Sequence, residues 1–215
     1  METEMLTIFD DEGIEIGTAP RSEVHKKGYW HQAFHCWFVC SENGIPYIYL
    51  QKRSPGKKDY PGLLDITAAG HLLAQETIED GVREIHEELG IDVSINDLIP
   101  LGIIKYCVMK EELDFIDKEL AHVYLFQHEG AINEFHLQEE EVSGMVKIEF
   151  NSFYEFCFGR RDELDILGFE ADSSGQKIEL KKTAAREDFV PHEREYYEVI
   201  AERIREKLER HFDED

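Results

Sequence analysis

Three glutamates, Glu84, Glu87 and Glu88, fall within five consecutive positions of the stretch VREIHEELGI. Residues three and four positions apart are neighbours on the surface of a helix, so this spacing brings the side chains together. Carboxylates held this close repel one another unless a cation lies between them. Hard dications such as Mg²⁺ take oxygen ligands, and they usually bind through a few carboxylates together with substrate phosphates. The cluster therefore indicates either a divalent-metal site or a solvated helix face that is rich in glutamate.

The stretch from Thr77 to Leu89 has the pattern of an amphipathic helix. Its apolar residues cluster within a sector of roughly 60°, and they are Ile78, Val82, Ile85 and Leu89. The glutamates lie roughly 140° away from that sector. Thr77 is the expected N-cap with Asp80 as its capping-box partner, and Gly90 is expected to end the helix. One face should therefore pack on the core while another presents the carboxylates.

The residues in and before this helix resemble the Nudix box. GHLLAQE contains Gly70 and Glu76 at the family's spacing, and REIHEELGI, which begins at Arg83, matches each specified position of the second half. The chain departs from the pattern once, because six residues separate Glu76 from Arg83 where the family has seven. Either the loop is one residue shorter, or Ala69 and Gln75 replace the glycine and the glutamate. We prefer the shorter loop, because it keeps Gly70 and Glu76.

The resemblance implies a Nudix-type α/β/α sandwich, of the α+β or α/β class, built around a mixed sheet. It also implies hydrolysis of a diphosphate linked to another group, with Mg²⁺ or Mn²⁺ as cofactor. By that analogy the metal ligands would be Gly70, through its carbonyl, Glu76, Glu84, Glu87 and Glu88. Glu76 would alternatively support the other ligands. Metal ions polarise phosphoryl oxygens and lower the pKa of bound water, which is chemistry that this cluster could use.

The same resemblance implies the rest of the catalytic group. Arg83 would orient its neighbours through ion pairs. Glu119 and Glu141 are the candidates for the general base, which varies in position among Nudix hydrolases. A base must reach the attacking water within hydrogen-bond distance, so the choice between them depends on the fold.

Residues 31–72 are similar to the branch of Nudix proteins that includes isopentenyl diphosphate isomerase. HQAFHCWFV and QKRSPGKKDYPGLLDITAAGHL carry this likeness. That isomerase uses a cysteine before a Gly-His pair, a downstream glutamate and a histidine-rich metal site. His31 and His71 occupy matching positions, His25 is a further candidate, and Glu119 aligns with the downstream glutamate. Packing or hydrogen bonding on strands is the alternative role for the histidines, and His35 and His122 are expected to be structural.

Two differences favour a hydrolase over an isomerase. Ala69 stands where the isomerase has its cysteine, and alanine cannot transfer a proton. The isomerases also lack the full Arg-Glu and Glu-Glu set that this chain contains. The predicted function is therefore hydrolysis of a nucleoside diphosphate derivative or a similar small diphosphate. Isopentenyl diphosphate isomerisation and a non-catalytic Nudix-fold binding module are the alternatives.

Arg53, Lys57 and Lys58 form a basic group in a Pro- and Gly-marked loop. A diphosphate needs such donors, and the aligned positions of the isomerase hold its substrate's phosphates. We therefore predict that these three residues bind substrate together with His31 and His71. A solvated loop is the alternative.

The composition limits the partners and the compartment. The formal net charge is −24, from 23 basic and 47 acidic residues, and this argues against nucleic acid polymers and anionic membranes as partners. The four cysteines lie in apolar stretches and are expected to be reduced core residues. The chain contains no apolar run of about 18 residues, and its first residues, METEML, do not resemble a signal peptide. A cytoplasmic protein is predicted.

These side chains must be positioned by a scaffold of short strands. Residues 5–17 and 31–53 are each expected to form a hairpin, and residues 98–108 and 120–128 further strands. The intervening segments 21–30 and 110–119 are expected to be connections. A last strand is expected at 144–150, followed by a helix with Asn151 as N-cap.

Residues 1–158 are predicted to form the Nudix domain, and residues 159–215 a C-terminal extension. This extension contains a hairpin with a Ser-Ser-Gly turn, followed by a helix. The apolar face of that helix consists of Tyr197, Ile200, Ile204 and Leu208. The extension is expected either to cover the pocket or to form a homodimer contact.

Overall fold

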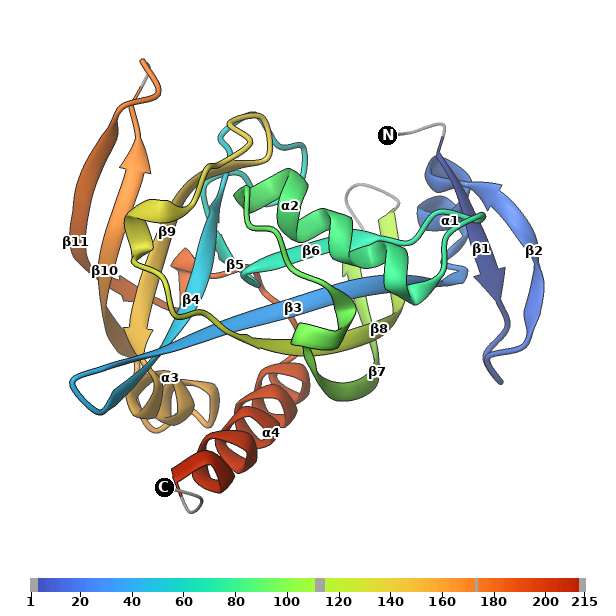
Figure 1. Ribbon diagram of the computed structural model, residues 1–215. Coiled ribbons are helices and arrows are strands. Elements are labelled where there is room, and N and C mark those ends of the chain that lie inside the picture. The colour runs from blue at the N-terminus through green and yellow to red at the C-terminus, as the bar shows by residue number, and fades with distance from the viewer. Residues whose placement is uncertain (1–3, 111–114, 173, 213–215) are drawn as a thin grey trace.

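The computed structural model describes residues 4–110, 115–172 and 174–212, and its strands form one sheet (Figure 1). The strands are β1 (Met5–Phe9), β2 (Glu15–Pro20), β3 (Trp30–Glu42), β4 (Ile45–Arg53), β5 (Leu64–Asp65), β6 (Ala68–His71), β7 (Ile99–Lys110), β8 (Phe115–Gln127), β9 (Val142–Glu149), β10 (Glu163–Ala171) and β11 (Lys177–Ala185). The α-helices are α1 (Arg21–Lys27), α2 (Arg83–Leu89), α3 (Phe150–Cys157) and α4 (Arg194–Phe212), and the 3₁₀ turn η1 (Ile78–Val82) leads into α2.

The sheet is mixed, as predicted. Its main path runs β11-β10-β9-β4-β3-β1-β2, and β8 pairs with β3 in the parallel direction while β7 pairs with β8. The short strand β6 pairs antiparallel with β3, so that His71 lies opposite Ala33. The long strand β3 therefore has β6 and β8 as neighbours, and these are the strands that carry the predicted site residues.

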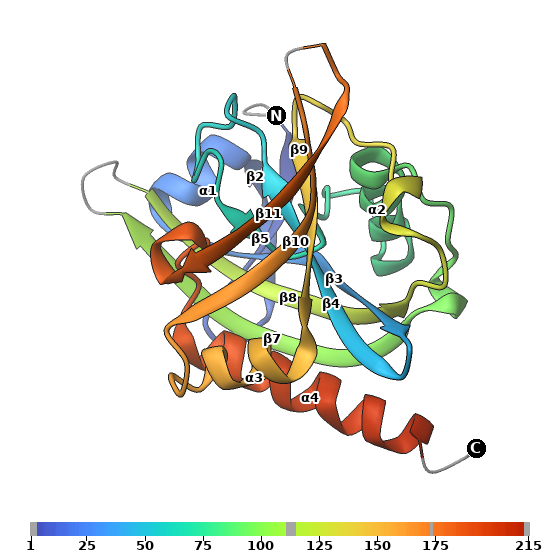
Figure 2. The same cartoon turned by 90° about the vertical axis from the view of Figure 1, so that its left-hand side faces the viewer.

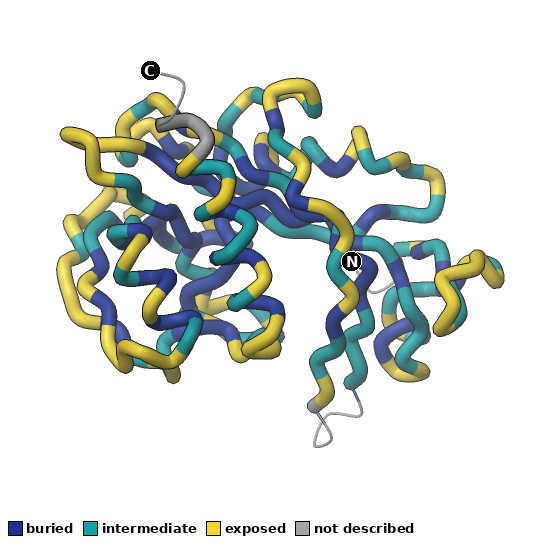
Figure 3. The backbone as a smooth tube through the Cα atoms, turned by 90° about the horizontal axis from the view of Figure 1, so that it is seen from below, coloured by how far each residue is buried: buried dark blue, intermediate teal, exposed yellow. Residues whose placement is uncertain are grey.

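Two hydrophobic cores lie on opposite faces of the sheet, because side chains alternate along β3. Phe34 and Phe38 pack with Ile85 of α2 on one face. Trp37 packs on the other face with α3 and α4, and its ring centroid lies 6.0 Å from that of Phe153. Helices thus cover both faces, with α2 on one side and α3 and α4 on the other (Figures 1 and 2). Buried residues run through the middle of the molecule, and exposed residues lie mostly on its outer segments (Figure 3). The predicted α/β/α sandwich is confirmed.

Two predicted connections are elements instead. Residues 21–27 form α1, which ends at Gly28 with φ 66°, and buries Val24 and His25. Residues 115–119 belong to β8, which places Glu119 opposite His31 of β3 and Tyr106 of β7. Both segments are rich in charged residues, and their buried polar side chains conceal the apolar alternation that indicates a strand or helix. The rest of the second predicted connection, residues 111–114, lies outside the described residues.

The prediction that residues 144–150 form the last strand of the sheet is wrong. The hairpin of β10 and β11 forms as predicted, but β10 pairs with β9, so the sheet continues into the C-terminal residues (Figure 2). The N-cap of α3 is Glu149 rather than Asn151. In α4 the predicted apolar face is confirmed, because Tyr197, Ile200 and Ile204 are buried and Leu208 packs against them.

The cysteines are free, as expected, but they are not equally buried. Cys36, Cys40 and Cys157 are buried, whereas Cys107 on β7 is only half-buried and is not a core residue. Among the described residues, no helix has the length and apolarity needed to cross a membrane.

Replacing Gly168 by alanine should destabilise the protein. A Cβ at this position would lie 2.0 Å from the carbonyl oxygen of Met145 and 2.7 Å from Cα of Val146, where β10 crosses β9. Because these neighbours are backbone atoms, we expect a loss of about 2–4 kcal/mol in the free energy of unfolding. Urea denaturation would measure this loss. Gly56→Ala is the control, since a Cβ at Gly56 meets only the Ser54 hydroxyl at 3.8 Å, and an equal effect of the two substitutions would contradict the packing argument.

Candidate functional site

The glutamates of α2 are held at the cavity by the packing of their own helix. Ile85 and Leu89 are fully buried and anchor α2 on the sheet. The predicted capping box is present, because Thr77 N donates to Asp80 Oδ2 at 2.8 Å. Gly90 ends the helix in the left-handed region with φ 67°. The helix therefore has a fixed rotation, which sets the direction of every carboxylate on it.

The three carboxylates differ in exposure. Glu88 is buried, the side chain of Glu84 is 13% exposed, and that of Glu87 is 52% exposed. All three line one cavity of about 610 Å³. The cluster is therefore not a solvated helix face, because two of its members turn towards the sheet.

The backbone of β6 lies directly against these carboxylates. A Cβ on Gly70 would lie 2.1 Å from Cδ of Glu84, so a larger residue would displace the Glu84 carboxylate from its present position. Ala69 N donates to Glu88 Oε2 at 3.3 Å, and Gln51 Nε2 donates to the same oxygen at 3.2 Å. Gly70, which we predicted as a metal ligand through its carbonyl, thus lies close to the carboxylates of α2.

Arg83 is the cation of this group. Its Nε and Nη2 donate to the two oxygens of Glu76 at 2.7 and 3.1 Å. Its Nη1 lies 2.7 Å from Glu84 Oε1 and 3.0 Å from Glu87 Oε2. Leu73 N also donates to Glu76 at 2.8 Å. Both oxygens of Glu76 are therefore engaged by donors, which is the geometry of a residue that supports Arg83 and its neighbours.

A single guanidinium does not neutralise this group. Burial raises the pKa of Glu84 to about 7, and burial together with the charge of Glu84 raises the pKa of Glu88 to about 8. Buried carboxylates keep their charge when a cation compensates for lost solvent. The donors are oxygens gathered at one wall of the cavity, so the residues fit a hard dication such as Mg²⁺ or Mn²⁺.

A second group of potential ligands lies beside the first. His25 of α1, His31 of β3, His71 of β6 and Asp117 of β8 each offer one atom, and these atoms all lie within 4.8 Å of one another. The four atoms, which are the three Nε2 atoms and Oδ1 of Asp117, are buried and make no hydrogen bond of good geometry. Asp117 Oδ1 lies 3.3 Å from His31 Nε2 and 3.5 Å from His25 Nε2. We call this group the histidine cluster. Four buried polar atoms that lie this close together without a well-formed hydrogen bond are the expected sign of a metal position.

The protonation of the histidine cluster differs between its members. His31 Nδ1 lies 3.2 Å from the carbonyl oxygen of Tyr29, so a proton on Nδ1 would leave Nε2 as the ligand atom. Although burial opposes it, Asp117 and Glu119 raise the pKa of His31, so a bound cation would have to displace a proton from Nε2. Burial lowers the pKa of His71 to about 4, and its imidazole is therefore neutral at pH 7. Three imidazoles and one carboxylate fit a borderline transition metal such as Zn²⁺ better than Mg²⁺.

Glu119 connects the histidine cluster to the sheet. Its Oε2 accepts a hydrogen bond from the Tyr106 hydroxyl at 2.7 Å and lies 3.0 Å from His35 Nε2. Its Oε1 lies 3.5 Å from His71 Nε2. Although burial opposes it, the adjacent His35 and His71 side chains hold the pKa of Glu119 well below its usual range. His35, which we predicted to be only structural, therefore contacts a candidate site residue.

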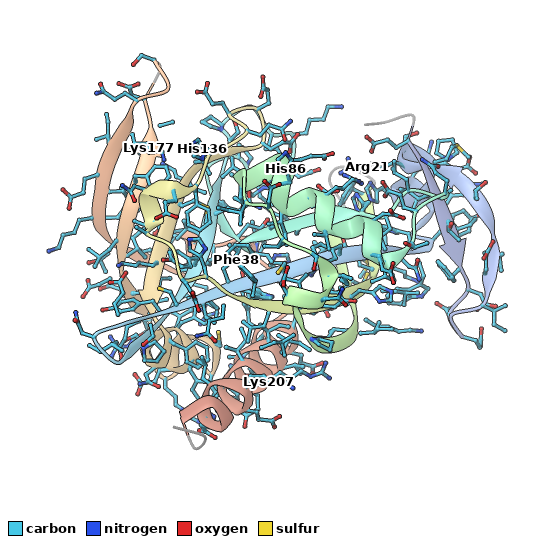
Figure 4. All side chains as sticks on the ribbon, viewed as in Figure 1. Arg21, Phe38, His86, His136, Lys177 and Lys207 are labelled. Carbon is cyan, nitrogen blue, oxygen red and sulfur yellow. The ribbon has the colours of Figure 1, made fainter. Side chains whose placement is uncertain are left out.

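Basic residues line the same cavity as the carboxylates. Arg53 Nη1 lies 2.8 Å from Asp65 Oδ2, and Lys57 forms an ion pair with Glu141. Arg53, Lys57 and Glu141 also line an adjoining cavity of about 880 Å³, and Lys58 lies in that second cavity. In Figure 4, Arg21 marks the start of α1 and His86 marks α2.

Most of the predicted site residues line the first cavity, namely Arg53, Lys57, Gly70, His71, Glu76, Arg83, Glu84, Glu87, Glu88, Glu119 and Glu141. His31 is absent from this lining because it is fully buried in the histidine cluster, and Lys58 lines only the adjoining cavity.

Sequence reasoning missed several residues of the cavity wall. Arg21 and Asp117 lie in segments that were predicted to be connections, and Asp117 and Glu119 alternate along β8 as inward-facing residues. That alternation of carboxylates was the available signal. No sequence pattern indicated Asp65 and His192, because only the fold brings them together. The distance between Asp65 Oδ1 and His192 Nε2 is 2.8 Å.

Comparison with known proteins gives a consistent result. Residues 29–156 match the NUDIX domain. An uncharacterized Nudix hydrolase of Clostridium acetobutylicum is 43% identical over 93% of this chain and 96% of its own length. An isopentenyl-diphosphate Delta-isomerase of Paenarthrobacter aurescens is 32% identical over 61% of this chain and 70% of its own. The crystal structure of DR0079 from Deinococcus radiodurans is similar in fold, with a TM-score of 0.55 and 18% identity, and the match covers 73% of this chain and 90% of that one.

Replacing Glu88 by glutamine should stabilise the metal-free protein at pH 9 and change little at pH 4. The folded-state pKa of about 8 exceeds the ordinary value of 4.5, so the stabilisation that the bound proton gives is fully present below pH 4.5 and is lost progressively as pH rises from 4.5 to 8. Glutamine stays neutral, and we expect a gain of about 3–5 kcal/mol at pH 9. Urea denaturation in EDTA measures this gain. Glu79→Gln, on the exposed side of η1, is the control, and a gain that is equal at both pH values would contradict the explanation.

Proposed function

The chain belongs to the NUDIX family and is a hydrolase of pyrophosphate bonds, and on this premise we propose that it cleaves a small diphosphate-linked substrate with Mg²⁺ or Mn²⁺. A nucleoside diphosphate derivative is the leading substrate class. The observation that carries the proposal is that Glu84, Glu87 and Glu88 line the same cavity as Arg53 and Lys57. The negative charge of a diphosphate must be compensated by cations. Arg53 and Lys57 would supply part of this positive charge, and bound metal would supply the rest.

Each residue of the cavity has a role in this proposal. Glu84, Glu87 and Glu88 would hold the metal, together with the carbonyl of Gly70. When bound, the metal would polarise a phosphoryl oxygen and lower the pKa of a water molecule. Arg83, fixed by Glu76, holds Glu84 and Glu87 in place through Nη1. Arg83 is therefore a positioning residue in this scheme rather than a substrate ligand.

Arg53 and Lys57 would bind the diphosphate. Their side chains are 17% and 22% exposed and line the cavity opposite α2. A partly buried guanidinium offers parallel N–H donors to phosphate oxygens, and its strength grows where water is scarce. Lys58 and the adjoining cavity would receive the remainder of the substrate.

Glu141 is the general base that we favour. It lies close enough to Glu88 for its charge to contribute to the raised pKa of that residue, and its ion pair with Lys57 keeps the carboxylate at the cavity wall. Glu119 instead uses Oε2 for two hydrogen bonds and turns Oε1 towards His71. Glu119 therefore belongs to the histidine cluster in our scheme, as a ligand or as a support for His71.

Replacing Glu87 by glutamine should reduce turnover by about 100-fold or more, because a metal ligand is lost. Glu87 is the most exposed of the three glutamates, so this substitution should leave the fold intact. The assay is phosphate-product release in Mg²⁺ or Mn²⁺ from nucleotide sugars, dinucleotides, nucleoside triphosphates and isoprenoid diphosphates. Glu79→Gln is the matched control, and we expect it to retain full activity. No turnover of any compound by the wild type, or equal turnover by the Glu87 variant, would refute the proposal.

The histidine cluster supports a second metal site in this proposal. Its four ligand atoms come from α1, β3, β6 and β8 and are buried without partners. His71 follows Gly70 in β6, so the two candidate metal sites meet at consecutive residues. A metal at the cluster would fix the cavity wall opposite the helix.

Replacing His25 by glutamine should lower the affinity for Zn²⁺ at least tenfold, because one of the four ligands is removed. The measurement is equilibrium dialysis against Zn²⁺ in excess Mg²⁺, followed by metal analysis. His86→Gln is the control, because the His86 side chain is 64% exposed on α2. We expect one tight Zn²⁺ per chain in the wild type and in this control. Equal Zn²⁺ affinity in all three proteins would exclude the cluster as the site.

Isopentenyl diphosphate isomerisation is the second candidate function. The histidine cluster and Glu119 favour it, since carbon protonation needs a metal-supported acid and base. Ala69 opposes it, because its methyl group lies on β6 beside Gly70 where an acidic side chain would be needed. The assay with isoprenoid diphosphates distinguishes isomerisation from hydrolysis, because isomerisation yields a new diphosphate without releasing phosphate.

A further inference from the structure

The segment Phe189–Tyr197 lies beyond residue 156, where the match to the family ends, yet it forms part of the cavity wall. Phe189 makes a parallel bridge with Leu64 of β5, and Val190 N donates to Leu64 O at 2.8 Å. Val190 and His192 both line the cavity. The segment is thus joined by its backbone to the strand that carries Asp65, and two hydrogen-bonded chains lead from it to candidate site residues.

The first chain runs from His192 to Arg53. His192 Nε2 lies 2.8 Å from Asp65 Oδ1, and Arg53 Nη1 donates to Asp65 Oδ2 at 2.8 Å. Ile66 N also donates to Asp65 Oδ1 at 2.8 Å. Asp65 is only 5% exposed. Each oxygen of this buried carboxylate is therefore engaged, which prevents the Asp65 side chain from rotating.

This anchoring fixes the plane of the Arg53 guanidinium. Asp65 holds Nη1, and the carbonyl oxygen of Asp59 accepts from Nε at 3.0 Å. Nη2 is the nitrogen that these two anchors do not use. A guanidinium held at both Nη1 and Nε presents its Nη2 donors in a set direction, so less entropy is lost when a phosphate binds. His192 would act on substrate through Asp65 and Arg53, without touching it.

The second chain runs from Tyr196 of α4 to Glu119. The Tyr196 hydroxyl lies 2.8 Å from His35 Nδ1, and His35 Nε2 lies 3.0 Å from Glu119 Oε2. Tyr196 and His35 are 1% and 2% exposed. If the hydroxyl donates to Nδ1, a neutral His35 carries its proton on Nε2 and donates it to Glu119. The free oxygen of Glu119, Oε1, is thereby directed at His71 of the histidine cluster.

We infer that the segment Phe189–Tyr197 is a component of the active site, in which His192 positions Arg53 for a substrate phosphate and Tyr196 positions Glu119 at the histidine cluster. The inference rests on the proposed function, because that proposal gives Arg53 and the cluster their roles. Both residues are positioning residues. The expected consequence is a separation of effects, since one chain serves phosphate binding and the other serves the cluster.

His192→Phe tests the first chain. Phenylalanine keeps an aromatic ring among Tyr106, Tyr196 and Tyr197, whose ring centroids lie 5.3–5.6 Å from that of His192, but it removes the donor to Asp65. We expect the Kd of inorganic pyrophosphate, measured by calorimetry with Mg²⁺, to rise about tenfold. With the best substrate of the panel, KM should rise by a similar factor and kcat should stay within about twofold.

Tyr196→Phe tests the second chain by removing one hydroxyl from a buried side chain. We expect a fall of about tenfold in kcat with KM unchanged, and a Zn²⁺ affinity weakened by a similar factor. Pyrophosphate binding should not change. Tyr154→Phe is the matched control, because its hydroxyl donates to Glu202 of α4 at 2.6 Å and Tyr154 does not line the cavity. This control should change none of the four quantities.

Two results would overturn the inference. One is wild-type pyrophosphate affinity in folded His192→Phe together with wild-type Zn²⁺ affinity in Tyr196→Phe. The other is a loss of pyrophosphate affinity, Zn²⁺ affinity and turnover in all three variants, including Tyr154→Phe. That result would mean that α4 only stabilises the fold. Pyrophosphate and Zn²⁺ binding do not depend on turnover, so they decide this inference even if the proposed hydrolysis fails.

Discussion

The burial of like charges on one wall of a cavity is the constraint on which the rest of this structure depends. Glu84 and Glu88 lie against the backbone of β6. Arg83 forms an ion pair with Glu84, whereas the cation that acts on Glu88 is Lys57. Such an arrangement costs free energy in the absence of a further cation. The fold tolerates it because Ile85 and Leu89 hold α2 on the sheet through a separate apolar contact. Stability and chemistry thus use opposite faces of one short helix.

The sheet converts distant parts of the sequence into one site. Strand β3 pairs with β6 on one part of its length and with β8 in parallel, which brings His31, His71 and Glu119 together. His25 reaches the same place from α1. Because two cores pack on the two faces of β3, these strands cannot shift independently. The resulting rigidity holds ligand atoms in position before any ligand arrives.

The cavity contains basic groups although the chain as a whole is acidic. The net charge is −24, yet Arg53 and Lys57 line the same cavity as the carboxylates of α2. The basic groups are few, and each is tied to a carboxylate that holds it in place, as Asp65 holds Arg53 and Glu141 holds Lys57. These ion pairs fix the direction in which each basic side chain points. The C-terminal segment adds to this pattern, because His192 contacts the Asp65 carboxylate that holds Arg53.

The sequence by itself determined the family, the sandwich class and the amphipathic helix of Glu84 and Glu88, because these depend on local spacing. Most of the site residues predicted from it line the cavity. The sequence did not determine α1, the extent of β8 or the continuation of the sheet into β10, since charged residues at buried positions conceal periodicity. Only the tertiary structure decided that His25 and Asp117 join the histidine cluster and that His192 and Tyr196 reach Asp65 and His35. Such contacts join residues far apart in the chain, so no local pattern records them; strand register and helix packing create them.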